Sequence, residues 1–151
     1  MKSYHGKYVV AESDGAANAN RAERDSWAIF TVEEVSYGAI VLRSHHGKYL
    51  VAEDSRSGYE VNANRDTRST GFSPEVFEVV FGIAENHGTV AFRTAHGRYL
   101  VAESDGRLRG DRTSISEWER FTPECINGKL MKSIILENMY MIFDMKLHNA
   151  Q

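Results

Sequence analysis

Three histidine-glycine pairs, each followed by a cation and a tyrosine, are the groups in this sequence best suited to chemistry. They are His5-Gly6-Lys7-Tyr8, His46-Gly47-Lys48-Tyr49 and His96-Gly97-Arg98-Tyr99. Imidazole can bind a metal or exchange a proton near neutral pH. Because the three histidines occupy equivalent turns, a threefold arrangement would hold them apart, so we expect no metal site and no cofactor. We expect each histidine to bond to the backbone of its turn.

A repeated carboxylate closes each of these motifs, at Glu12, Glu53 and Glu103. A group that recurs three times is expected to serve the fold, because a catalytic group is usually needed once. The sequence has no serine-nucleophile elbow, zinc-protease motif, phosphate-binding glycine loop or paired cysteines. We therefore expect a protein that is not an enzyme and has no catalytic residues.

The cations are the best candidates for binding a partner, because basic side chains at loop tips can steer an acidic partner into contact. The partner-binding candidates are Lys7, Lys48, Arg98, Arg24 and Arg68. Solvated charges without a partner are the alternative interpretation. Arg21, Arg65 and Arg112 recur at equivalent positions, which favours a structural salt bridge or a carbonyl contact for these three.

These side chains must be positioned by a four-strand unit that occurs three times. The first strand of a unit is apolar (39–43 and 89–93), and the second begins at the tyrosine of the motif. The third is short and precedes Arg21, Arg65 or Arg112, and the fourth runs through 30–32 and 77–80. The middle copy carries three short insertions between its motifs, where loops tolerate them. The copies cover about 1–37, 38–87 and 88–127 of one domain spanning 1–151, with a divergent segment at 128–151.

Three units of four short strands predict an all-β protein, and a β-trefoil with pseudo-threefold symmetry is the standard solution for such repeats. A propeller is a poor fit, because it usually needs at least four blades. We expect three core layers with one residue from each copy. The layers are Val9, Leu50 and Leu100; Ala17, Val61 and Leu108; and Phe30, Phe77 and Phe121.

The repeat His-Gly-Lys/Arg-Tyr-Leu-x-Ala-Glu, followed by a Val-Asn-Ala-like strand and then Trp-x-x-Phe, resembles the repeat of the fascin-like β-trefoils. This group includes the fascins and the histidine-rich, hisactophilin-type actin-binding trefoils. The match covers roughly residues 4 to 121. The resemblance implies a cytoplasmic module that binds filamentous actin or the cytoskeleton. Fascins carry four such domains and this sequence has one, so we expect the monomer to decorate filaments without bundling them.

Two other functions stay open, a lectin-like trefoil that binds a glycan and a general protein-interaction module. Ricin-type lectins carry Gln-x-Trp in each repeat, and this sequence has none. The net charge of −3 argues against nucleic acid as the partner, since such binders are strongly basic. The single cysteine suits a reducing compartment, and no apolar run is long enough to span a membrane. The oligomeric state is left open between a monomer and a weak dimer.

Two local features give structural expectations. Gly6, Gly47 and Gly97 are expected to take a positive φ in at least one copy, where alanine would cost about 1 kcal/mol or more. Copy one has only residues 1–4 ahead of its turn. We expect residues 129–134 to supply the missing first strand beside the N-terminus, with residues 138–142 in the place of the next turn and strand. A disordered appendage is the alternative interpretation of this segment.

Overall fold

The computed structural model describes residues 1–36, 38–69, 71–81 and 88–124. In this part of the chain the structure is built from short antiparallel strands, as the repeats predict, and it also contains three 3₁₀ turns. Copy one contributes β1 (Tyr8–Ala11), β2 (Ala17–Arg21) and β3 (Thr31–Ser36); copy two β4 (Ala39–Arg43), β5 (Tyr49–Ala52), β6 (Val61–Arg65) and β7 (Phe77–Val80); copy three β8 (Ala91–Arg93), β9 (Tyr99–Ala102) and β10 (Leu108–Arg112). The 3₁₀ turns are η1 (Ser26–Ala28), η2 (Ser55–Ser57) and η3 (Glu117–Glu119).

The first and fourth strands of the copies form a nearly closed barrel. β3 pairs with β4, β4 with β7 and β7 with β8, all antiparallel. The ring continues through isolated bridges, because Val90 pairs with Phe121 and Thr122 pairs with Lys2. Lys2 also pairs with Tyr8. In the other copies the last residue of β4 or β8 pairs with the first residue of the following strand in the same way. The N-terminal residues thus supply the first strand of copy one in shortened form.

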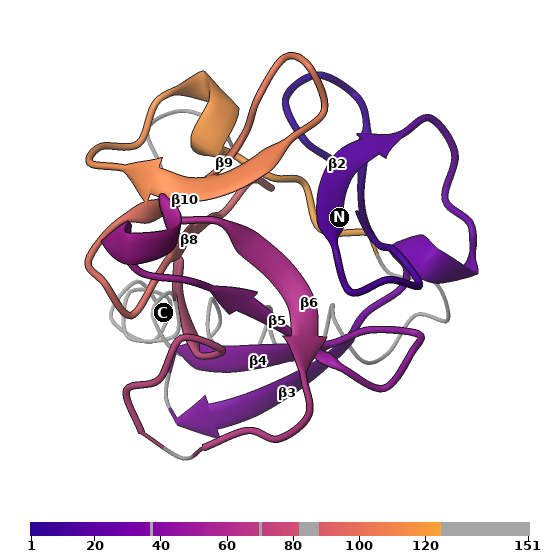
Figure 1. Ribbon diagram of the computed structural model, residues 1–151. Coiled ribbons are helices and arrows are strands. Elements are labelled where there is room, and N and C mark those ends of the chain that lie inside the picture. The colour runs from indigo at the N-terminus through magenta and orange to yellow at the C-terminus, as the bar shows by residue number, and fades with distance from the viewer. Residues whose placement is uncertain (37, 70, 82–87, 125–151) are drawn as a thin grey trace, which may run out of the picture.

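The second and third strands of each copy form a hairpin, and the three hairpins cap one end of the barrel. The hairpins are β1–β2, β5–β6 and β9–β10, arranged around the centre of the view in Figure 1. Neighbouring hairpins are linked by one backbone hydrogen bond each. The links run from Ala19 N–H to the Gly106 carbonyl (2.8 Å), from Ala63 to Gly15 (2.8 Å) and from Gly110 to Tyr59 (3.0 Å).

The turn between the first and second strands is fixed by glycine and by a buried hydroxyl. Gly6, Gly47 and Gly97 have φ of 76°, 78° and 75°, which confirms the predicted positive φ. Two residues before each histidine, a buried Ser or Thr hydroxyl accepts the histidine N–H at 3.2 Å. These residues are Ser3, Ser44 and Thr94.

All nine residues of the predicted layers belong to one buried cluster, which confirms that they are core. A further layer was not predicted: Met1, Leu42 and Phe92 occupy equivalent positions and are all buried. The alignment of the copies did not identify Met1 as a core residue, because only four residues of copy one precede its turn. The expectations for residues 129–134 and 138–142 lie outside the described residues.

Candidate functional site

The repeated histidines link one copy to the next. Each Nε2 lies within hydrogen-bond distance of a carbonyl in the preceding copy, at the end of its second strand. The pairs are His5 with Ala102 (3.0 Å), His46 with Ala11 (3.1 Å) and His96 with Ala52 (2.9 Å). Since a carbonyl can only accept, Nε2 donates. The prediction that these rings bond to their own turns is therefore wrong: their partners are backbone groups, but of the neighbouring copy.

An aromatic ring from the preceding copy packs against each histidine. Trp27 on η1 contacts His46 and Trp118 on η3 contacts His5, each with ring centroids 4.8 Å apart. Copy two has Pro74 where the tryptophan would stand. Tyr59 fills that role from a different segment, with its centroid 6.5 Å from that of His96. Alignment of the three copies does not reveal this replacement, because it places Tyr59 opposite Gly15 and Gly106 and not opposite the tryptophans.

The repeated carboxylates pair with the repeated arginines. Arg21 lies 2.9 Å from Glu12, Arg65 lies 3.9 Å from Glu53, and Arg112 pairs with Glu103. These contacts confirm that the arginines form structural salt bridges. They also give the three glutamates a structural role, as repetition predicted.

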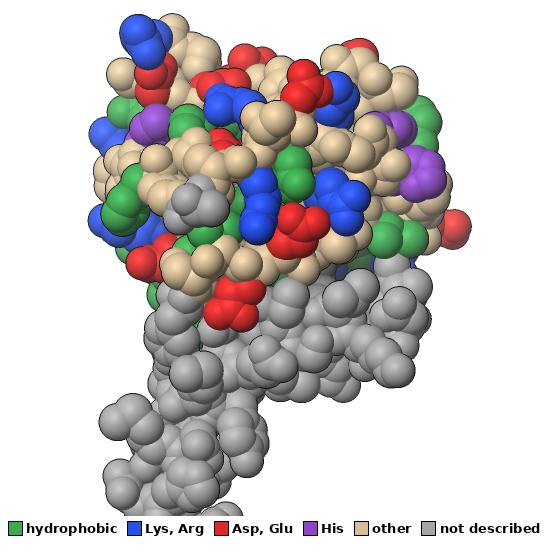
Figure 2. All heavy atoms as spheres, turned by 90° about the horizontal axis from the view of Figure 1, so that it is seen from below, with side chains coloured by type: hydrophobic (Ala, Val, Ile, Leu, Met, Phe, Trp, Pro, Cys, Tyr) green, Lys and Arg blue, Asp and Glu red, His purple; other side chains and the backbone are tan. Residues whose placement is uncertain are grey.

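Four of the five candidate binding cations are engaged within the chain. Lys48 pairs with Asp66, Arg24 lies 3.0 Å from Glu124, and Arg68 lies 3.7 Å from Glu33. Arg98 donates to the Asp111 carbonyl at 3.2 Å and stacks 4.9 Å from the Tyr59 ring centroid. Lys7 is exposed in the turn before β1. On the face shown in Figure 2, cationic and anionic side chains are interspersed and do not gather into a patch of one sign.

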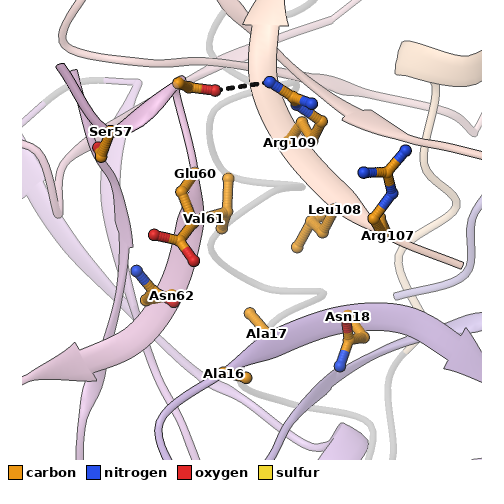
Figure 3. Close-up of a pocket in the computed structure, with 11 residues that line it drawn as sticks. Ala16, Ala17, Asn18, Ser57, Glu60, Val61, Asn62, Arg107, Leu108 and Arg109 are labelled. Carbon is orange, nitrogen blue, oxygen red and sulfur yellow. Dashed lines mark hydrogen bonds between the residues drawn. The ribbon is translucent and has the colours of Figure 1, made fainter. Parts of the chain in front are cut away.

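A solvent-open pocket of about 400 Å³ lies where the three cap hairpins meet, and we call it the three-hairpin pocket. Its floor is the predicted layer Ala17, Val61 and Leu108, which is buried. The residues on either side of each floor residue line its rim. Figure 3 shows Arg107 and Arg109 on either side of Leu108, across the floor from Glu60 and Asn62. The rim residues are Ala16, Asn18, Ser57, Gly58, Glu60, Asn62, Arg107 and Arg109.

The rim breaks the threefold symmetry that its backbone keeps. Ala16, Glu60 and Arg107 are equivalent positions, and so are Asn18, Asn62 and Arg109. Bridges between hairpins pair members of these two sets, for example Glu60 with Arg109 and Asn18 with Arg107. One scaffold therefore presents a methyl group, a carboxylate and a guanidinium at equivalent points. The sequence analysis did not single out these residues. They could have been found as aligned positions at which the three copies differ in charge.

A buried carboxylate elsewhere has a structural explanation. Glu75 is 1% exposed and accepts hydrogen bonds from the Ser69 N–H (2.7 Å) and from the hydroxyls of Ser69 and Ser73. Burial alone would raise the pKa of Glu75, but these hydrogen bonds outweigh it and hold the pKa below its ordinary value. The carboxylate thus fixes the loop inserted before β7.

Two further observations concern the described ranges only. Within them, no group of three or more His, Cys, Asp or Glu side chains is placed to hold a metal ion. No helix in the same ranges has the length and apolarity needed to cross a membrane.

Comparison with known families agrees with this architecture. Residues 1–75 match the sequence model of a family described as "Beta-trefoil domain of unknown function (DUF569)". A comparison with curated proteins finds no match. The match supports a β-trefoil and does not single out the fascin-like group. With the three-copy barrel and its hairpin cap, it identifies the chain as a β-trefoil, similar over residues 1–75 to this family of β-trefoil domains of unknown function.

Proposed function

We propose that this domain is a non-enzymatic binding module that takes a small polar ligand in the three-hairpin pocket. The observation that carries the proposal is the contrast between recurring and non-recurring residues. The pocket has an apolar floor that recurs in all three copies and a polar rim that does not. Its volume lies within the range of about 300–1,000 Å³ that is usual for small-molecule sites.

The three copies provide an internal comparison of which residues the fold requires. The turn histidines, the Glu–Arg pairs and the floor recur, and each has a structural contact. Glu60 and Arg107 are equivalent to Ala16, so neither side chain is required by the backbone that carries it. Ligand sites commonly combine an apolar lining with a few polar side chains that fix the orientation of the ligand, and the floor and rim of this pocket provide both.

A lectin-like site is the alternative at the same position. Glycan sites commonly use an exposed aromatic ring, and none of the residues lining this pocket is aromatic. Tyr59, whose sequence neighbours Gly58 and Glu60 line the rim, has the Arg98 guanidinium over its ring. This arrangement favours a small polar ligand over a stacked sugar.

An NMR titration with a panel of small molecules tests the proposal. The panel should contain amines, carboxylates, phosphates, neutral alcohols and simple sugars. We expect at least one compound to perturb the amides of residues 16–18, 57–62 and 107–109, and Ala16→Trp, which fills the rim, to abolish that response. Perturbations confined to other surfaces, or none across the panel, would contradict the proposal.

Actin-filament binding in the cytoplasm is the second candidate function. It is supported by the resemblance of the repeats to those of fascins and by Lys7, whose exposed amine has no side-chain partner among the described residues. Co-sedimentation with filaments tests it, with Lys7→Ala as the variant expected to weaken pelleting. Electron microscopy should show decorated filaments without tight bundles, because one small domain offers one site. If the protein stays in the supernatant, this candidate is wrong.

A further inference from the structure

One carboxylate on the rim of the three-hairpin pocket has no ionic partner within the described part of the chain. Glu60 is exposed at the start of the third strand of copy two. Its backbone carbonyl accepts the Glu53 N–H at 2.8 Å, and its side chain has no hydrogen-bond or ionic partner among the described residues. Figure 3 shows its carboxylate beside Asn62, at the edge of the apolar floor.

Each of the two guanidiniums of the rim lies beside a carboxylate of its own copy, and Asp111 is shared with Arg112. Arg107 Nε lies 2.8 Å from Asp105 Oδ2, and Arg109 Nε lies 3.5 Å from Asp111 Oδ2. Arg109 also donates to the Gly58 carbonyl at 2.7 Å, the dashed contact in Figure 3. Its guanidinium is thereby turned toward the wall of the pocket. Of the three charged residues that line the rim, Glu60 is therefore the one whose side chain has no ionic partner among the described residues.

The remaining polar groups of the rim add hydrogen-bond acceptors. Asn18 donates its amide N–H to Glu12 at 3.2 Å, which leaves its side-chain carbonyl free to accept from a ligand. Asn62 and Ser57 also line the pocket and can accept a hydrogen bond. An ammonium group has three donors and no acceptor, so it complements a carboxylate surrounded by amide and hydroxyl oxygens.

We propose that the ligand of this pocket bears an amine. Its ammonium group pairs with Glu60, and its short apolar body lies on Ala17, Val61 and Leu108. This inference rests on the proposed function, because it names the chemical class of ligand for the same pocket. Since Glu60 is exposed, the ion pair is worth little in water, and we expect about a fivefold preference for the amine over its neutral counterpart at low salt. The preference should shrink as salt is added.

A matched set of three probes tests the charge of the ligand directly. Cyclohexylamine, cyclohexanol and cyclohexanecarboxylate share one apolar ring and differ in the polar group. In an NMR titration at pH 7 and low salt, we expect cyclohexylamine to bind most tightly, with shifts at residues 16–18, 57–62 and 107–109. Glu60→Gln should remove the preference for the amine and leave the affinity for cyclohexanol unchanged. Glu78→Gln is the matched control, because it removes an exposed carboxylate on β7, away from the pocket.

The outcomes separate this inference from the proposal beneath it. If cyclohexanecarboxylate or cyclohexanol binds the pocket as tightly as the amine, the amine assignment is wrong and the pocket is still a ligand site. An amine preference that survives Glu60→Gln contradicts the role of Glu60. If the amine does not perturb the pocket at all, the inference fails, and the wider panel then decides whether the pocket binds any ligand.

Discussion

At the residue scale, the glycines of the two turn types differ in what surrounds them. Gly6 and Gly47 have positive φ, but a Cβ atom there would meet nothing within 4 Å. Gly15 and Gly106 also have positive φ, and they lie against the neighbouring hairpin. A Cβ at Gly106 would stand 2.7 Å from the Cβ of Asn20. The first pair is constrained by backbone conformation alone, and Gly106 by conformation and packing together.

Gly106→Ala should therefore destabilise the protein more than Gly6→Ala. We expect a loss of about 2 kcal/mol or more for Gly106→Ala and about 1 kcal/mol for Gly6→Ala, measured by urea denaturation. Gly71→Ala is the control, because Gly71 has no positive φ and its Cβ position is open. Equal effects at Gly6 and Gly106 would show that packing between hairpins does not limit this position.

The buried carboxylate Glu75 predicts a pH dependence of stability. Its folded-state pKa lies below its ordinary value of 4.5, so the unfolded chain takes up its proton first on acidification. The stability that Glu75 contributes is complete above that ordinary value and is lost as the pH falls through the folded-state pKa.

Glu75→Gln should cost about 1–3 kcal/mol at pH 7, because it weakens the hydrogen bonds that hold Ser69 and Ser73. It should also make the free energy of unfolding fall less than in the wild type between pH 6 and pH 3. Urea denaturation across this range measures both effects. Glu78→Gln, at an exposed carboxylate, should follow the wild-type curve, and a Glu75→Gln curve parallel to the wild type would refute the prediction.

At the element scale, the turns between the first and second strands of each copy act as links between copies. Each turn places a histidine against the preceding copy, where it donates to a carbonyl and packs on an aromatic ring. The repeats thus hold one another by the same contact three times. The third link keeps the carbonyl contact, at 2.9 Å, and has Tyr59 in place of a tryptophan at a longer ring distance of 6.5 Å.

His46→Ala should weaken the link between copies one and two. We expect a loss of about 1–2 kcal/mol, because the Ala11 carbonyl loses its donor and Trp27 loses a packed ring. The neighbouring His45→Ala is the control, since His45 is exposed. Thermal unfolding of the two variants gives the comparison, and similar melting temperatures would contradict the structural role of His46.

At the scale of the whole molecule, the barrel depends on a contact between residues far apart in the sequence. Lys2 and Thr122 exchange two backbone hydrogen bonds, of 2.9 and 2.8 Å. Lys2→Pro removes one donor and should cost about 1–3 kcal/mol. Lys2→Ala keeps the backbone bond and should change stability little. A Lys2→Pro variant as stable as Lys2→Ala, in urea denaturation, would mean that the contact does not hold the barrel together.

The sequence by itself determined the fold class, the three copies, their strands and most of the core. It could do so because each copy repeats the same local pattern of turn glycine and alternating apolar residues, and three aligned copies separate this pattern from chance. The structural role of Glu12 and Arg21 also followed from repetition alone.

Only the tertiary structure decided which contacts the copies make with one another. The carbonyl partner of His5 in copy three, the replacement of a tryptophan by Tyr59 and the closure of the barrel by Lys2 all join residues that no local pattern connects. The same holds for the three-hairpin pocket. Glu60, Arg107 and Ala16 share one rim only because the pseudo-threefold packing brings three separate hairpins to a common axis.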